Sequence, residues 1–260
     1  MNEVLAEPAI LLAGQSVLLE DVLRYAHQRG RLLPLLQEAV IDSVVRTAAA
    51  ERQLTISDSQ LQLAADEFRR QQGLESAAET FRWLQHRQLS VADFEAGLET
   101  ELLREQLGDA VLEDLLPAFW TQQRGAYDRI RWSQILVGRE DLAQEILLQL
   151  QSGEAEFPDL ARALSMHPSA TAGGAMGEVF RRELPPALLE NLNPALAGSL
   201  YGPYVVPEGI LIARVEAVQE ARLDTATLRA IRAELFEAWV TQRLRQTPSS
   251  FPLLKRLTGL

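Results

Sequence analysis

The sequence predicts an α+β protein with two lobes: a mainly helical lobe, and a smaller domain of β-α-α-α-β-β order inserted into it. Three observations lead to this prediction. Residues 1–128 carry apolar side chains at helical spacing, residues 129–221 change to short β-branched and glycine-rich stretches, and residues 222–260 return to a helical pattern. We expect the C-terminal helix to pack on the N-terminal helices and to be followed by a tail.

The first helices are recognisable from their periodicity. The stretch LLEDVLRYAHQRG has apolar residues about every 3.6 positions and ends at Gly30, a residue that suits a C-terminal helix cap. Residues 32–54 are apolar almost all round and are therefore expected to form the central helix of the lobe. Residues 76–88 predict a short amphipathic helix. The aromatic residues expected in the core of the bundle are Trp83, Phe94, Phe119, Trp120 and Trp239.

Capping side chains mark the starts of two further helices in this lobe. Ser57 followed by Gln60 forms a capping-box pattern, and Ser90 followed by Asp93 forms a second one. The helix after Ser90 should run until Pro117, because proline removes a backbone donor and clashes with the preceding turn.

The central segment alternates between strand and helix patterns. IRWSQILV is rich in β-branched and aromatic residues, which is typical of a strand. Gly173, Gly174 and Gly177 are expected at backbone positions with positive φ. In order, we expect a strand at 130–137, helices at 139–153, 156–165 and 184–192, two strands within 202–218 joined by a turn at 207–209, and a helix capped by Asp224.

Composition and charge exclude several classes of function. The 260-residue chain has a formal net charge of −11 and no basic run, so no nucleic-acid partner is expected. It has no cysteine and only three histidines, far apart, so we expect neither a metal site nor a cofactor. The N-terminal stretch starts acidic, and its apolar run AILLAG is too short for a signal peptide or a span. We therefore expect no membrane insertion and a cytoplasmic location.

One string of residues carries a family resemblance. GGAMGEVFRRELPPALL, with WSQILV before it and GPYVVPEGILIARV after it, resembles the parvulin family of peptidyl-prolyl cis-trans isomerases. The resemblance covers about residues 129–219, and the whole arrangement is similar to SurA- and PrsA-like chaperones, including those of cyanobacterial genomes. It implies a PpiC-type parvulin domain inserted into a helical chaperone lobe that binds unfolded or extended polypeptides.

The parvulin pattern implies a polar network of two histidines with Cys or Asp and Ser or Thr partners. In this chain the first-strand histidine is Gln134, the last-strand histidine is Leu211, and the Ser or Thr position is Val206. The Cys or Asp position falls at His167, or at Met166 if the alignment slips by one residue. Gln134 and His167 are therefore the residues at degenerate catalytic positions.

The apolar half of the pattern is better kept. The residues expected to bind a proline or a peptide are Met176, Leu184, Leu188, Val206 and Leu211. Glu208 stands where the family usually has an aromatic residue just before the last-strand glycine.

These substitutions lead to one predicted function and two open alternatives. A network that lacks both imidazoles should lose most of its contribution, so we expect a weak or inactive isomerase. The predicted function is a SurA-like chaperone that holds extended or unfolded client segments in a degenerate parvulin slot. The alternatives are a slow but active prolyl isomerase, and a maturation or secretion adaptor dedicated to one peptide or protein.

Overall fold

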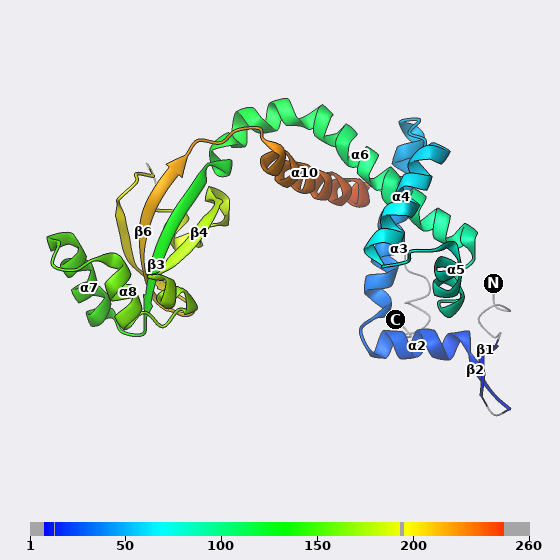
Figure 1. Cartoon of the computed structure of the whole chain (residues 1–260), viewed down its shortest axis with the longest axis horizontal. Helices are drawn as coiled ribbons and strands as arrows, with labels where there is room; N and C mark the ends of the chain where they lie inside the picture. The colour runs from blue at the N-terminus through cyan, green and yellow to red at the C-terminus, as the bar shows by residue number, and fades with distance from the viewer. Residues whose placement is uncertain (1–7, 13, 193–194, 247–260) are drawn as a thin grey trace. The chain divides into compact units, whose positions relative to one another are not determined.

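The computed structural model describes residues 8–12, 14–192 and 195–246, so the tail expected after residue 246 lies outside the described residues (Figure 1). The chain divides into two compact units, Met1–Leu115 with Ile231–Leu260, and Leu116–Ala230. The first unit is mainly helical and the second holds a four-stranded antiparallel sheet. The predicted α+β class is therefore confirmed. The divisions fall inside helices α6 and α10, and not at the boundaries expected after residues 128 and 221.

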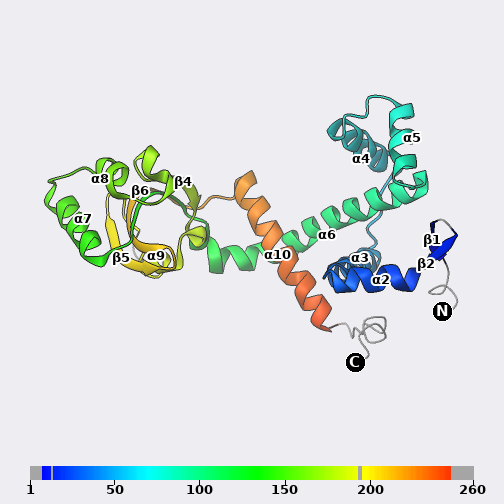
Figure 2. The same ribbon diagram turned by 90° about the horizontal axis from the view of Figure 1, so that it is seen from below.

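The first unit contains a hairpin and a series of helices. Two of its helices, α6 and α10, extend into the second unit. Figure 2 shows α4 and α5 beside the beginning of α6. The elements are β1 (Pro8–Leu12), β2 (Gln15–Leu18), α2 (Leu19–Gln28), α3 (Leu32–Glu51), α4 (Asp58–Gln71), α5 (Ala77–His86), α6 (Val91–Gln123) and α10 (Thr225–Gln246).

Local capping chemistry places the starts of these helices where the sequence predicts them. The Gln60 backbone N–H donates to Ser57 Oγ at 3.3 Å, and the Ser57 backbone N–H donates to the Gln60 side chain at 3.0 Å. Ser90 and Asp93 make the same reciprocal pair, with both distances at 3.0 Å. Both predicted capping boxes are confirmed.

Two expectations for the first unit are wrong. The first is that residues 32–54 form a central helix. Instead, helix α3 buries only one face of its C-terminal half and Leu32, while Leu33 and Leu35 are exposed. The buried residues of that face are Val44, Val45, Ala48 and Ala49. Helix α6 does not stop at Pro117 but continues to Gln123. Phe119 and Trp120 just beyond the proline pack against the Tyr127 ring. Such ring contacts contribute about 0.5–1.5 kcal/mol each and so offset part of the cost of about 3 kcal/mol that proline imposes inside a helix.

The aromatic residues expected in the bundle core are half-buried instead. Trp83 and Phe94 pack edge-to-face with Phe68, at ring-centroid distances of 5.1 and 5.0 Å, and Trp239 stacks on Phe236. Phe119 and Trp120 belong to the second unit. The fully buried side chains of the first unit are aliphatic, such as Val45, Leu107 and Ile231.

Within the first unit, the C-terminal part of α10 packs against α6. The Arg232 guanidinium lies 2.5 Å from Asp109 and donates to the Glu105 carbonyl at 2.6 Å. Gly108 makes this approach possible, because a Cβ at that position would lie 3.0 Å from the guanidinium. At the other end of α10, the Thr227 backbone N–H donates to Asp224 at 2.9 Å, which confirms the predicted cap.

The second unit is built on a sheet of strand order β4-β3-β6-β5, with every neighbouring pair antiparallel. The structure adds strand β4 to the predicted β-α-α-α-β-β order. The other strands and helices lie close to their predicted positions, except that the helix expected at 184–192 is reduced to four residues, Pro186–Leu189. The elements are η1 (Arg124–Tyr127), β3 (Arg129–Val137), α7 (Glu140–Ser152), α8 (Phe157–Leu164), η2 (Pro168–Ala172), β4 (Ala175–Phe180), η3 (Arg181–Glu183), α9 (Pro186–Leu189), β5 (Leu200–Val206) and β6 (Gly209–Gln219).

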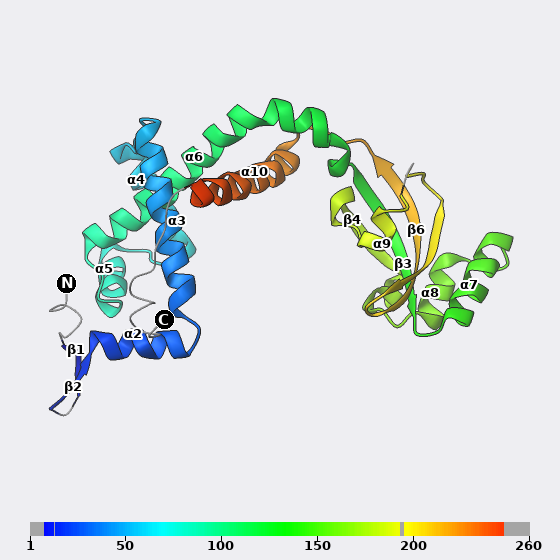
Figure 3. The same ribbon diagram turned by 180° about the vertical axis from the view of Figure 1, so that it is seen from behind.

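The two faces of this sheet are covered differently. Ile135 and Val137 of β3 and Ile212 of β6 pack with Ile146 and Phe157 under α7 and α8. Alternate residues of the same strands point the other way, because side chains alternate along a strand. Trp132, Leu211, Ala213 and Val215 therefore pack against α9 and its neighbours. Figure 3 shows α7 and α8 on one side of the sheet and α9 on the other.

A glycine turn fixes the loop that leads into β4. Gly173, Gly174 and Gly177 have φ angles of +67°, +83° and +86°, as the sequence predicts. Gly174 is also sterically required, because a Cβ there would lie 2.4 Å from the Gln134 carbonyl oxygen. The Gln134 backbone N–H donates to the Gly174 carbonyl at 2.8 Å, so the turn is anchored on β3.

Candidate functional site

A pocket of about 410 Å³ opens on the α9 face of the sheet. We refer to it as the slot. Strand β3 supplies alternate residues to its lining, Trp132, Gln134 and Leu136. Five of the residues predicted at the site line the slot: Gln134, His167, Met176, Val206 and Leu211. The sheet thus brings together residues that are up to 77 positions apart in the chain (134 to 211).

Leu184 and Leu188 are the two predicted peptide-binding residues that do not line the slot. Leu184 is 4% exposed and Leu188 is fully buried, and both belong to the core cluster beneath it. Leu188 lies on the short helix α9, and Leu184 lies just before it, directly after η3. They support the slot from below, and Pro185 between them lines it.

The floor of the slot is apolar at the position where the parvulin pattern has its last-strand histidine. Leu211 on β6 is 2% exposed and pairs in register with Leu136 of β3 and Tyr204 of β5. Met176 and Val179 of β4 and Val206 of β5 form its walls. A leucine side chain neither donates nor accepts hydrogen bonds, so this part of the slot offers a ligand only van der Waals contact.

Gln134 provides one polar group inside the slot. Its side chain is 7% exposed, and its amide makes no hydrogen bond to another residue of the described chain. The Gly174 contact holds only its backbone. The amide is therefore free to donate to, or accept from, a group that enters the slot.

His167 provides a second polar group, and its ring is held in one tautomer. The Ser169 backbone N–H donates to His167 Nδ1 at 3.1 Å, and the Ser169 hydroxyl lies 2.9 Å from the same atom. Because Nδ1 accepts from the backbone, the proton of the neutral ring lies on Nε2. Of the two residues that the sequence leaves open for the Cys or Asp position, His167 lines the slot, whereas Met166 is 59% exposed and does not line it.

The site contains a residue that the sequence analysis missed, Trp132. Its indole is 4% exposed and lines the slot, and its Nε1–H is buried without a hydrogen-bond partner in the described structure. Buried indole N–H groups usually find an acceptor. The signal was available, since Trp132 lies two residues before Gln134 on a predicted strand and must share its face.

Two carboxylates, Glu183 and Glu208, also line the slot. Glu183 is the last residue of η3, and Glu208 lies in the turn between β5 and β6. Only Glu208 could be related to the site from the sequence, because it stands where an aromatic residue was expected. Glu183 enters through the fold of the loop between β4 and α9.

Structural comparisons show that the fold resembles that of solved proteins. A peptidylprolyl isomerase, PrsA, from Bacillus anthracis is similar with a TM-score of 0.54 at 19% identity, covering 83% of this chain and 100% of that one. PrsA from Bacillus cereus is similar with a TM-score of 0.53 at 17% identity, covering 98% of each chain.

Sequence comparisons show similarity to chaperones and to one domain family. The chain is 26% identical to the chaperone SurA of Vibrio cholerae over 199 residues, and 25% identical to the chaperone SurA of Photobacterium profundum over 241 residues. Residues 138–217 match the family model described as Rotamase: PPIC-type PPIASE domain. The chain thus carries a segment that matches a PPIC-type parvulin domain, and over most of its length it is similar to SurA chaperones.

The matches to the SurA chaperones cover most of this chain but only part of each relative. They cover 76% and 89% of this chain but 44% and 53% of the two SurA chaperones, so the chain spans about half the length of these curated relatives. The family match begins at residue 138, directly after β3. Trp132 and Gln134 therefore lie outside the matched segment, although they line the slot of the parvulin domain.

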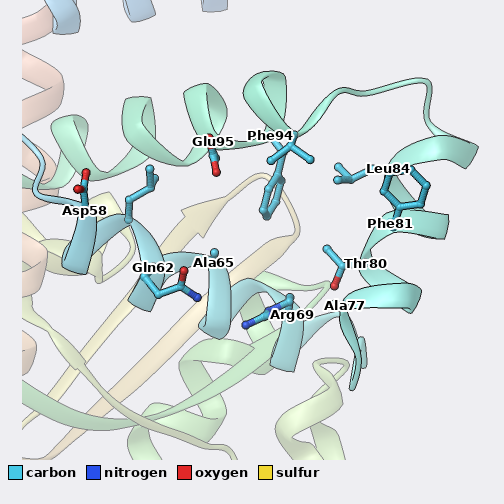
Figure 4. Close-up of a pocket in the computed structure, with 12 residues that line it drawn as sticks. Asp58, Gln62, Ala65, Arg69, Ala77, Thr80, Phe81, Leu84, Phe94 and Glu95 are labelled. Atoms are coloured by element: carbon cyan, nitrogen blue, oxygen red, sulfur yellow. The ribbon is translucent and has the colours of Figure 1, made fainter.

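The first unit has a hollow of its own, between α4, α5 and the start of α6. It has a volume of about 440 Å³ and an apolar middle that includes Leu84 and Phe94. Figure 4 shows Asp58 of α4 and Glu95 of α6 toward one end of it and Phe81 of α5 at the other. Phe94 also packs edge-to-face with the half-buried rings of Phe68 and Trp83.

Neither a metal cluster nor a membrane-crossing helix is found in the part of the chain that the structure describes. Within residues 8–12, 14–192 and 195–246, no three His, Asp or Glu side chains are placed to hold a metal ion. In the same ranges, no helix is both long and apolar enough to cross a membrane.

Proposed function

We propose that this chain is a SurA-like peptide-binding chaperone whose parvulin domain holds apolar, proline-containing client segments without catalysing their isomerisation efficiently. The observation that carries the proposal is the composition of the slot. Its apolar floor and walls are intact, while leucine and valine occupy two positions at which the family pattern has polar side chains.

The reaction itself explains why these substitutions matter. Rotation about an X-Pro bond crosses a barrier of about 18–20 kcal/mol and breaks no covalent bond. A catalyst must therefore favour the twisted amide over the planar one, and hydrogen bonds aimed at the twisted carbonyl supply that preference. Leu211 and Val206 cannot make such bonds. An apolar slot binds the planar and twisted forms about equally, and uniform binding does not accelerate the step.

A slow isomerase is the second candidate, and one observation favours it. Gln134 and His167 line the same slot, and each has a group that could reach a peptide carbonyl: the Gln134 amide and His167 Nε2–H. A rearranged network of these two residues would retain part of the parvulin chemistry. An adaptor that serves a single partner is the third candidate, and the breadth of client binding tests it.

A protease-coupled assay on a short X-Pro peptide separates the first two candidates. We expect a rate close to the uncatalysed one, with peptide binding still measurable by NMR titration. A rate comparable to that of an intact parvulin would overturn the proposal. If turnover does occur, Gln134→Ala and His167→Ala should each reduce it, and unchanged rates would exclude the rearranged network.

Aggregation assays test the chaperone half of the proposal. We expect the full chain to suppress the aggregation of several unrelated unfolded proteins. Suppression limited to one protein would favour the dedicated adaptor. A matched control is a variant such as Leu148→Ala, which alters an exposed leucine on α7, away from the slot.

A further inference from the structure

The slot of the parvulin domain carries negative charge beside its apolar floor. Glu183 and Glu208 both line it, and neither forms an ion pair with another residue of the described chain. No lysine or arginine of the described residues lines the slot with them. We call these two carboxylates the acidic rim.

Glu183 is held in position by the backbone. The Phe180 N–H donates to its Oε2 at 2.9 Å, in the capping pattern of η3. The hydrogen bond orients the carboxylate and leaves its second oxygen available. A fixed carboxylate loses less conformational entropy on binding a cation than a freely rotating one.

The arginines beside Glu183 are engaged elsewhere. Arg182 donates to the Tyr127 hydroxyl at 2.6 Å, and its guanidinium lies 4.5 Å from the centre of that ring. Arg181 lies 3.9 Å from the Asp128 carboxylate. The cations nearest in sequence therefore have their own partners, and the negative charge of the acidic rim is left for a ligand.

An independent observation inside the slot also points to a ligand. The Trp132 Nε1–H is buried without an acceptor in the described structure, in a side chain that is 4% exposed and lines the slot. A buried donor of this kind is costly when unpaired and is usually satisfied by a partner. A carbonyl of a bound polypeptide is an acceptor that could satisfy it.

We infer that the slot selects polypeptide segments in which a lysine or arginine lies next to the apolar residue that enters it. The apolar residue contacts Met176, Val206 and Leu211, the cationic side chain faces the acidic rim, and a backbone carbonyl accepts from Trp132. The net charge of −11 adds long-range attraction toward such clients. This inference rests on the proposed function, because it specifies which segments the slot holds.

The test uses the full chain and three dye-labelled peptides that differ only in the residue beside a central proline: lysine, alanine or glutamate. Fluorescence anisotropy gives each Kd at low and at physiological salt. We expect the lysine peptide to bind about three- to tenfold more tightly than the glutamate peptide, because each exposed charge pair contributes modestly. The ratio should shrink as salt is raised.

Paired variants assign the preference to the acidic rim. The double substitution Glu183→Gln/Glu208→Gln should bring the lysine-to-glutamate ratio close to one, because neutral amides no longer distinguish the two charges. The matched control is Glu154→Gln/Glu190→Gln, which removes two exposed carboxylates outside the slot lining and should leave the ratio unchanged. Because Glu183 also caps η3, Glu208→Gln alone is included, and we expect it to lower the ratio part of the way.

The outcomes separate this inference from the proposed function. Equal affinity for all three peptides, or a ratio that the rim variant leaves intact, overturns the acidic-rim selection and leaves peptide binding by the slot standing. Failure of the alanine and lysine peptides to bind at all overturns the proposed function itself.

Discussion

The two faces of the four-stranded sheet share the strands β3 and β6 but are built for different purposes. The face under α7 and α8 is closed, with Ile135, Ile146 and Ile212 fully buried in one apolar cluster. The face toward α9 is partly open and carries Gln134 and an unpaired indole N–H among its apolar residues. One register of alternating side chains thus places a closed apolar layer on one side of the two strands and the slot on the other.

The two faces differ in whether they contain unpaired polar groups. Buried polar groups are costly unless they are paired, so a closed face excludes them. An open face that keeps them unpaired has a stability cost that a ligand can recover. Substitutions on the closed face should therefore change folding with little effect on ligand affinity, and substitutions on the open face should do the opposite.

The largest expected effect comes from the closed face. Ile146→Ala should lower the free energy of unfolding by about 3 kcal/mol, because it leaves a cavity in a fully buried cluster. Urea denaturation followed by circular dichroism measures this loss. The control on the same helix is Leu148→Ala, which is 65% exposed and should cost no more than about 0.5 kcal/mol. A changed peptide Kd for folded Ile146→Ala would contradict the separation of the two faces.

The glycines just before β4 and within it should give the next effect. Gly174→Ala introduces a Cβ that would lie 2.4 Å from the Gln134 carbonyl, at a φ of +83°. Gly177→Ala has nearly the same φ, +86°, but no atom within 4 Å of its new Cβ. We expect Gly177→Ala to cost about 1–2 kcal/mol from the backbone alone, and Gly174→Ala to cost clearly more. Equal losses in denaturant titrations would show that the close approach to β3 has no effect.

Substitution on the open face should give a smaller effect of opposite sign on folding. Trp132→Phe removes the unpaired N–H, so we expect the free energy of unfolding to stay level or to rise by up to about 1 kcal/mol. The same change should weaken peptide binding about threefold or more, because the donor is lost to the ligand. The control is Trp239→Phe on α10, for which we expect unchanged peptide affinity. Lower stability with unchanged affinity would mean that the Trp132 indole acts only in packing.

The smallest effect is expected away from both faces, at the start of α10. The Thr227 backbone N–H, and secondarily Arg129, hold the pKa of Asp224 below its ordinary value of 3.8. A depressed pKa contributes stability that is present above the ordinary value and is lost as the pH falls through the depressed one. The melting temperature should therefore fall slightly less between pH 4 and pH 2 in Asp224→Asn than in the natural chain. An identical fall would show that this carboxylate does not contribute.

How much of the fold could be predicted from the sequence depends on how far apart in the chain the interacting residues lie. The caps at Ser57, Ser90 and Asp224 and the helix stop at Gly153 follow from local chemistry, and the structure shows each of them. Strand β4 and the β1–β2 hairpin were missed, because short segments with glycine or an unbroken apolar run carry no alternating pattern. Pairing with a neighbouring strand decides such segments.

The candidate site could likewise be predicted only in part. Five predicted residues line the slot, since the parvulin pattern fixes which strand positions face it. Leu184 and Leu188 were predicted as contacts, but sequence spacing cannot separate a pocket wall from the core layer directly beneath it. Glu183 entered the site through a loop whose path depends on the whole domain.

The most direct test of the central claim measures binding and isomerisation on one sample. Two-dimensional NMR exchange spectroscopy on an isotope-labelled Lys-Pro peptide, with a substoichiometric amount of the full chain, reports both at once. We expect peptide resonances to shift in both the cis and the trans form, with no exchange cross-peaks between them beyond the uncatalysed background. Cross-peaks that grow with the amount of protein and disappear in Gln134→Ala would show a working isomerase, and would contradict the proposal that the slot only holds its clients.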